Sequence, residues 1–196
     1  MIHPDTTLTY MNDAIGYGVV ATRFIPRGTI VWVLDELDRK FDADYVKSLD
    51  PVMRSTIIKY SYRDYQGNYI LCWDIARYVN HSFDSSMIGT AYNFEVAARD
   101  IYPGEELTDD YGYFNLEEPF DCLPEAGDAR TQVMPDDIWH YYAEWDWKAA
   151  QAIKQSLHVA QPLWHLMTPS LREKVVAIAT GQEPMDSILS IATWNL

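Results

Sequence analysis

Short runs of β-branched and aromatic residues, each bounded by turn residues, occupy most of the first 110 positions of the chain. Val19–Thr22 and Thr29–Leu34 are the clearest predicted strands, with Pro26–Gly28 as the turn between them. Further turns and strands are predicted at Gln66–Asn68, Tyr69–Trp73, Ala91–Ala98, Pro103–Gly104 and Leu107–Thr108. Many short strands at close spacing with few long helices predict a compact, mainly β fold.

Helical patterns dominate the remainder of the chain. Two short helices are predicted within the β-rich part, at Ala43–Leu49 with Asp42 as a possible cap and at residues 52–59, with Asp50-Pro51 between them. After Pro135 the pattern changes. The predicted helices run from Pro135 to about His158, from Thr168-Pro169 to Gly181, and near Ile188–Thr193. We therefore expect a β-rich domain over residues 1–123, with an insert at about 36–68, and a helical extension over 124–196 that packs on it.

Aromatic residues recur at helical spacing in this extension. Trp139, Tyr142, Trp145 and Ala149 lie on one face of the first long helix. Such a stripe favours a buried face packed against the β-rich body. The alternative is an exposed patch for forming a homodimer or for gripping a peptide substrate.

Charge and composition restrict the classes of binding partner that are expected for this chain. The formal net charge of −14 argues against nucleic acid as a direct partner, because nucleic-acid-binding surfaces need clustered Lys and Arg. An acidic field favours a lysine-rich basic polypeptide instead, although acidity also simply keeps proteins soluble. With two cysteines, no apolar run of the ~20 residues a membrane span needs, and no signal-like start, an intracellular, cytoplasmic location is expected, and the nucleus stays open.

Three short motifs stand apart from the strand and helix patterns. They are Gly16-Tyr17-Gly18, then Arg77-Tyr78-Val79-Asn80-His81-Ser82, then Gly104-Glu105-Glu106-Leu107-Thr108-Asp109-Asp110-Tyr111-Gly112. Taken singly, each has an ordinary explanation: glycines serve the backbone, a lone histidine is usually structural, and a tyrosine in a turn usually packs on the core. In this order, over roughly residues 10–123, they resemble the SET-domain protein lysine methyltransferases.

The resemblance implies a pseudoknotted, β-clip-like fold and an S-adenosylmethionine cofactor. It implies transfer of a methyl group to the side-chain amine of lysine, with S-adenosylhomocysteine as product. Tyr111 would be the catalytic tyrosine, its hydroxyl aligning the methyl group together with nearby carbonyl oxygens. The implied cofactor-binding residues are Gly16, Tyr17, Gly18, Tyr60, Arg77, Asn80, His81 and Leu123. Tyr62, Tyr92 and Tyr113 are candidates for an aromatic substrate channel, which would lower the pKa of the incoming lysine.

The chain departs from the family pattern at the positions where many members bind zinc. Phe83, Pro124 and Ala129 stand where cysteines would fall, which leaves Cys122 without partners. One thiolate does not make a structural zinc site, so we predict no metal. Ser85 and Ser86 also replace the usual Pro-Asn, and Asp109 replaces an aromatic residue that often limits the number of methyl groups added. The alternative hypothesis is therefore a SET-like interaction module that has lost catalysis.

Overall fold

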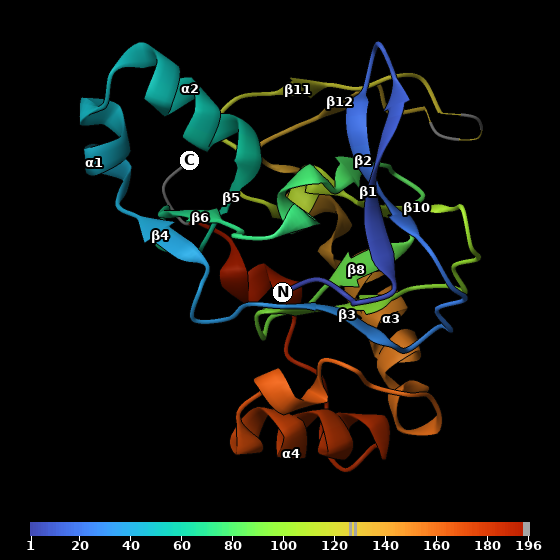
Figure 1. The fold of residues 1–196 in the computed structure, drawn as a ribbon. Helices are drawn as coiled ribbons and strands as arrows, with labels where there is room; N and C mark the ends of the chain where they lie inside the picture. Colours follow the sequence, from blue (N-terminus) through green and yellow to red (C-terminus); the bar gives the residue numbers. More distant parts are fainter. Residues whose placement is uncertain (126, 128, 194–196) are drawn as a thin grey trace.

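The computed structural model describes residues 1–125, 127 and 129–193. One sheet carries the three motifs. It contains β1 (Thr6–Asn12), β2 (Gly16–Ala21), β10 (Glu106–Asp109) and β7 (Asn80–His81), in the order β1-β2-β10-β7 (Figure 1). The strands β10 and β7 are parallel, and Asp109 lies opposite His81. This pairing brings the Asn80-His81 motif to the strand that leads directly into Tyr111.

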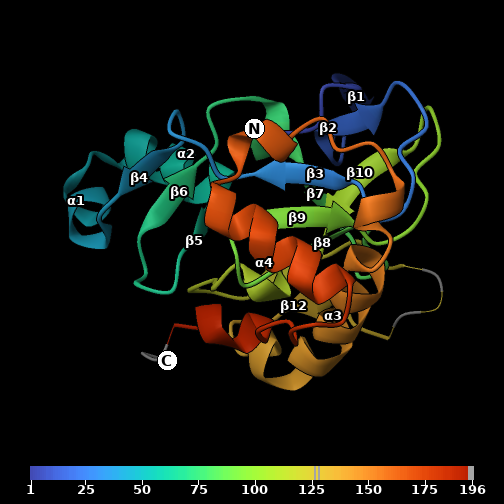
Figure 2. The ribbon, with the colours of Figure 1, turned by 90° about the horizontal axis from the view of Figure 1, so that it is seen from below.

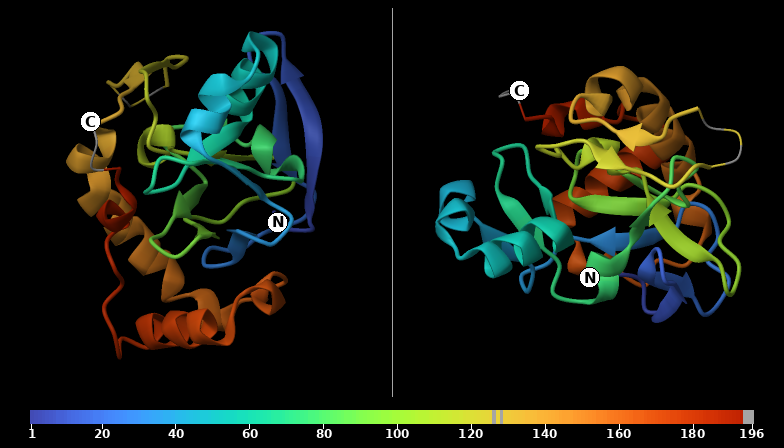
Figure 3. Two further views of the ribbon diagram at one scale, coloured as in Figure 1. Left: turned by 90° about the vertical axis from the view of Figure 1, so that its left-hand side faces the viewer. Right: turned by 90° about the horizontal axis from the view of Figure 1, so that it is seen from above.

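Three smaller sheets surround this one. The first is β3 (Ile30–Val33), β9 (Phe94–Ala97) and β8 (Met87–Gly89), in the order β3-β9-β8. The second lies in the insert and has the order β4-β6-β5, from β4 (Arg39–Phe41), β6 (Tyr69–Leu71) and β5 (Ser61–Arg63). The third is the pair β11 (Phe120–Asp121) and β12 (Gln132–Val133). Figure 3 shows the insert projecting on one side of the molecule.

Two short helices extend the insert. They are α1 (Ala43–Ser48) and α2 (Pro51–Tyr60), and each begins at an aspartate whose side chain accepts backbone N–H bonds. Asp42 accepts from Asp44 and Tyr45, as the sequence predicts for this cap. None of the residues of α2 is fully buried. Proline is the first residue of α2, so Asp50-Pro51 starts the second helix as well as ending the first.

The helical extension covers one face of the β3–β9–β8 sheet (Figure 2). It contains α3 (Asp137–Ile153), α4 (Pro169–Ala179) and a 3-10 turn at Ile188–Ile191. Trp145 of α3 is buried in a core cluster with sheet residues such as Ile88 and Phe94. The predicted fold, mainly β with a helical C-terminal region, is confirmed, and the aromatic stripe is chiefly a packing face. Trp147, which is not part of the stripe, is 62% exposed.

Some boundaries differ from those expected. Pro135 precedes α3, which begins at Asp137 and ends at Ile153, short of His158. The strand β1 has no predicted counterpart, and its seven residues alternate only weakly between exposed and half-buried positions. The strands β2 and β3 belong to different sheets, because β2 pairs with β1 and β10 whereas β3 pairs with β9. No helix in the described ranges has the length and apolar character of a membrane span.

Candidate active site

Tyr111 is held in place by three separate interactions. It opens a short 3-10 turn, and the Asp110 side chain caps that turn by accepting the Gly112 N–H at 3.0 Å. Its own N–H donates to His81 Nδ1 at 3.1 Å, and its hydroxyl donates to the carbonyl oxygen of Val79 at 2.7 Å. Burial raises the pKa of Tyr111 far above its usual value, so the phenol stays protonated as a donor. His81 thus positions the tyrosine through its backbone.

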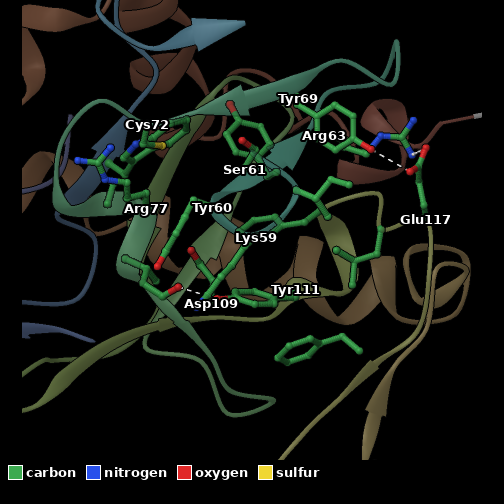
Figure 4. Close-up of a pocket in the computed structure, with 18 of the residues that line it drawn as sticks. Lys59, Tyr60, Ser61, Arg63, Tyr69, Cys72, Arg77, Asp109, Tyr111 and Glu117 are labelled. Atoms are coloured by element: carbon green, nitrogen blue, oxygen red, sulfur yellow. Dashed lines mark hydrogen bonds and ion pairs between the residues drawn. The ribbon is translucent and has the colours of Figure 1, made fainter. Parts of the chain in front are cut away.

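The Tyr111 side chain lines a cavity of about 520 Å³. The lining combines aromatic residues, among them Trp32, Tyr62 and Phe114, with aliphatic and charged side chains. In Figure 4 the cavity runs from Cys72 and Arg77 at one end to Arg63, Tyr69 and Glu117 at the other. A chamber of this size and composition suits a long apolar side chain with a polar end.

Two carboxyl groups form a polar patch on the cavity wall. Glu95 lies on β9 between buried Phe94 and Val96, so strand alternation turns it to the opposite side from those core residues. Asp109 ends β10, is 2% exposed, and its Oδ1 accepts the Tyr113 hydroxyl at 2.7 Å. Burial raises the pKa of Asp109 to about 6. Burial, and secondarily the charge of Asp109, hold the pKa of Glu95 well above its usual range.

An aromatic row leads away from the cavity along the surface of β2. The Tyr60 and Tyr78 rings lie 5.3 Å apart, and the Tyr78 and Tyr17 rings lie 6.4 Å apart. Arg77 lines the cavity beside this row, with its guanidinium 5.5 Å from the Tyr78 ring centre. Its Nε atom is buried and has no hydrogen-bond partner. The site therefore offers both a stacking surface and an unsatisfied donor.

The backbone conformation and the packing of the protein itself account for the two glycines of the first motif. Gly16 adopts a φ of +83°, in the left-handed region that favours glycine. At Gly18 an added Cβ would lie 2.2 Å from Glu106 Oε1 and 3.0 Å from Asn80 Nδ2. Asn80 Nδ2 donates to that Glu106 oxygen at 2.7 Å and to the Tyr17 carbonyl oxygen at 3.0 Å. The absence of a side chain at Gly18 therefore leaves the space that the hydrogen bond between Asn80 and Glu106 occupies.

The predicted channel residues separate into three positions. Tyr62 lines the cavity, where it packs edge-on against Trp32 at 5.8 Å. Tyr113 is 2% exposed and lies behind Asp109, so it orients that carboxyl and does not line the channel. Tyr92 is directed to the helical extension, where its hydroxyl accepts the Asp186 N–H. Tyr92 and Tyr113 are thus absent from the cavity lining, because their hydroxyl groups are bonded to Asp186 and Asp109 instead.

The remaining predicted cofactor residues lie outside the cavity lining. Tyr60 and Arg77 line it, whereas Gly16, Tyr17, Gly18, Asn80, His81 and Leu123 do not. Leu123 is 58% exposed, and it follows β11 on the same segment as the cavity residue Phe120. The cavity residues that the sequence analysis missed, Trp32, Glu95 and Phe114, come from distant strands and turns and carry no motif.

The segment after Tyr111 is tied down by a cation–aromatic contact. The Arg130 guanidinium lies 4.0 Å from the Phe83 ring centre and 4.3 Å from that of Tyr141, and it pairs with Asp110 at 3.4 Å. Glu125 accepts hydrogen bonds from the Ser82 hydroxyl and the Phe83 N–H. Phe83 therefore serves as an anchor for this segment. Within the described residues, no three His, Cys, Asp or Glu side chains form a metal-binding group.

The motifs, their order and their convergence on one tyrosine define a SET-domain protein. A family model described as the SET domain matches residues 16–112. Residues 16–112 therefore belong to the SET-domain family, whose members are typically protein-lysine methyltransferases.

Two solved structures of methyltransferases are similar to this chain. The chain is similar to the methyltransferase domain of human histone-lysine N-methyltransferase SETMAR, at 18% identity and a TM-score of 0.46, covering 68% of this chain and 58% of that one. It is also similar to a Plasmodium falciparum protein to which histone methyltransferase activity is ascribed, at 16% identity and a TM-score of 0.41, covering 56% of this chain and 95% of that one. No curated protein matches.

Proposed function

We propose that this protein transfers a methyl group from S-adenosylmethionine to the side-chain amine of lysine in a basic protein. The observation that carries the proposal is the position of Tyr111, whose hydroxyl bonds the Val79 carbonyl oxygen while its side chain lines an aromatic cavity of about 520 Å³. A hydroxyl oxygen and a carbonyl oxygen in contact form an electronegative edge, which suits an electron-poor methyl group.

The residues present fit S-adenosylmethionine. The row of Tyr60, Tyr78 and Tyr17 suits a flat heteroaromatic ring, and the unpartnered Nε of Arg77 suits a carboxylate. When bound, this cofactor supplies a methyl group activated by a sulfonium centre. In this proposal the chain's own residues bind it, exclude water and align the lysine, and such alignment is worth roughly 7–11 kcal/mol in well-oriented systems.

The proposed substrate is a lysine within a basic segment, such as a histone-like or ribosomal tail. The formal net charge of −14 would attract such a segment. Glu117 and Glu118 add carboxylates to the cavity lining, and Glu117 is paired with Arg63 at 3.2 Å. The aromatic side chains of the cavity would then contact the apolar stem of one lysine side chain.

The test is methyl transfer from isotopically labelled S-adenosylmethionine to a panel of histones and ribosomal proteins. We expect labelled lysine with the wild-type chain and a loss of about 100-fold or more in rate for Tyr111→Phe, because the missing hydroxyl acts mainly in the transition state. Cofactor affinity should stay nearly unchanged. The control is Tyr102→Phe, since Tyr102 is 57% exposed and does not line the cavity.

Two outcomes would count against the proposal. Full activity in Tyr111→Phe would remove Tyr111 from the catalytic role. No transfer to any basic protein, from a folded chain that binds a basic segment, would favour the inactive interaction module.

A further inference from the structure

The Glu95 and Asp109 carboxyls are buried together without a cation. Burial of carboxylate charge is costly unless an opposite charge or hydrogen-bond donors compensate it. The only hydrogen-bond donor to the pair from elsewhere in the described chain is the Tyr113 hydroxyl, which bonds Asp109. Among the described residues neither carboxyl takes part in an ion pair. The pair thus has unused accepting capacity that faces the cavity.

Arg54, Lys59, Arg63 and Arg77 line the cavity, and among the described residues no ion pair joins any of them to Glu95 or Asp109. Arg63 pairs with Glu117, the Lys59 ammonium lies 5.1 Å from the Tyr60 ring centre, and Arg77 lies over Tyr78. The Glu95–Asp109 pair therefore lies on the cavity wall without an ion-pair partner among the described residues. An incoming cation would complete it.

Asp109 also lies close to Tyr111 along the chain. Both residues line the cavity, whereas the intervening Asp110 turns away to cap Gly112 and to pair with Arg130. A ligand atom that reached Tyr111 would therefore be near the carboxyl pair. We infer that Glu95 and Asp109 are specificity-determining residues, which accept N–H hydrogen bonds from the ammonium group of the substrate lysine.

This inference rests on the proposed function and deepens it. Two carboxylates in contact do not both ionise readily, and burial raises the pKa of both groups, that of Asp109 to about 6. An ammonium group is a cation that complements such a pair. The ionisable groups that influence the pair from neighbouring elements are Tyr62, Cys72, Asp110, Tyr111, Tyr113 and the Met1 ammonium. Of these, only the Met1 ammonium is cationic.

Recognition of the ammonium group by the pair has two components, its positive charge and its N–H donors. Ligands that lack one or both of these features separate the two components. A primary alkylammonium offers both positive charge and N–H donors. A quaternary ammonium keeps the charge and loses the donors, and an alcohol of similar length has no charge. The pair should therefore prefer primary amines to quaternary ones, and both to the alcohol.

The experiment is an NMR titration of the full chain at pH 8 with n-butylammonium chloride, butyltrimethylammonium chloride and 1-pentanol. We expect n-butylammonium to bind at least tenfold more tightly than either other probe. The variants Glu95→Gln and Asp109→Asn should each weaken its binding several-fold, and the double variant at least tenfold. Glu36→Gln, which changes an exposed carboxylate, should bind n-butylammonium like wild type.

Equal affinity for n-butylammonium and 1-pentanol would overturn the inference, as would unchanged n-butylammonium affinity in the double variant. Equal affinity for the quaternary probe would overturn the hydrogen-bonding component. Asp109→Asn retains an acceptor for the Tyr113 hydroxyl, and thermal unfolding checks that each variant is folded. If the double variant does not fold, loss of n-butylammonium binding by the wild-type chain between pH 8 and pH 5 gives the same test, because the pair then becomes neutral.

Failure of this inference is distinguishable from failure of the proposed function. Titration with S-adenosylhomocysteine runs in parallel on the same samples. If the chain binds n-butylammonium through the pair but does not bind S-adenosylhomocysteine, the amine site is supported and the methyltransferase proposal is refuted. If the chain binds S-adenosylhomocysteine and methylates lysine, but the variants bind n-butylammonium as tightly as wild type, only the role inferred for the carboxyl pair is refuted.

Discussion

The Arg130 guanidinium lies 4.0 Å from the centre of the Phe83 ring. This contact joins the segment after the turn that starts at Tyr111 to the residues that follow the Asn80-His81 motif. Because Arg130 also pairs with Asp110, which caps the turn that starts at Tyr111, it connects the segment to the site as well.

Removing this guanidinium should destabilise the protein. Arg130→Met leaves the Asp110 carboxyl, whose side chain is 1% exposed, without its cation. Loss of one partner from such a pair costs roughly 3–5 kcal/mol, and the partial exposure of Arg130 places the expected loss near the lower end. Urea unfolding measures it. Arg130→Met combined with Asp110→Asn should recover part of the loss, and an additive double-mutant cycle would show that the pair does not couple.

A chelator should leave the fold intact. We predict no structural zinc, since Phe83, Pro124 and Ala129 offer no ligands beside Cys122. The expected melting temperature is the same with and without EDTA, as followed by circular dichroism. A fall of several degrees together with stoichiometric zinc in the untreated sample would refute this prediction.

Gly18→Ala should disturb the site more than a methyl group added at a glycine outside the site. The new Cβ would displace the Glu106 carboxylate from Asn80, a charge-assisted bond worth roughly 1.5–3 kcal/mol. Gly104→Ala is the matched control for a tolerated methyl, because no atom lies within 4 Å of its added Cβ, although its φ of +90° costs roughly 1–2 kcal/mol. We expect both variants to lose stability in urea and only Gly18→Ala to weaken S-adenosylhomocysteine binding. Equal affinity in the two variants would contradict a role for Asn80 in the cofactor site.

The buried carboxyl pair should leave a signature in the pH dependence of stability. The folded-state pKa of Asp109, about 6, exceeds the unfolded value near 3.9. The folded state then binds more protons in this interval, so this contribution to stability is present below pH 3.9 and lost as pH rises through about 6. Each unit of pKa corresponds to about 1.4 kcal/mol.

The variant with both Glu95→Gln and Asp109→Asn lacks these titrating groups. Its free energy of unfolding, relative to wild type, should therefore rise between pH 4.5 and pH 8, as measured by urea unfolding at the two values. A constant difference across that range would mean that the pair does not titrate there.

The sequence predicted the fold class because the strand runs, the turn residues and the helix caps are local signals. Asp42, Thr168 and Gly181 mark helix ends where expected, and Gln66–Asn68 makes the predicted hairpin turn between β5 and β6. The strand β1 gave no such signal, because four of its seven residues are exposed and none is buried.

The site was predictable only as far as its motifs extend. Tyr111 and His81 were found because they lie in motifs with a fixed order. Glu95 was missed, since a single glutamate within the run Phe94–Ala97 resembles an ordinary solvent-facing strand residue. Tyr92 was placed in the channel for its aromaticity alone. Only the tertiary packing shows that Tyr92 meets the helical extension while Glu95 faces the cavity.

The central claim is that this chain forms a cofactor-binding active site around Tyr111. Calorimetric titration with S-adenosylmethionine and S-adenosylhomocysteine, for the wild-type chain and for Tyr111→Phe, tests it most directly. The account predicts binding near one molecule per chain for both ligands, with similar affinity in the variant. No detectable binding of either ligand to a folded wild-type sample would contradict it.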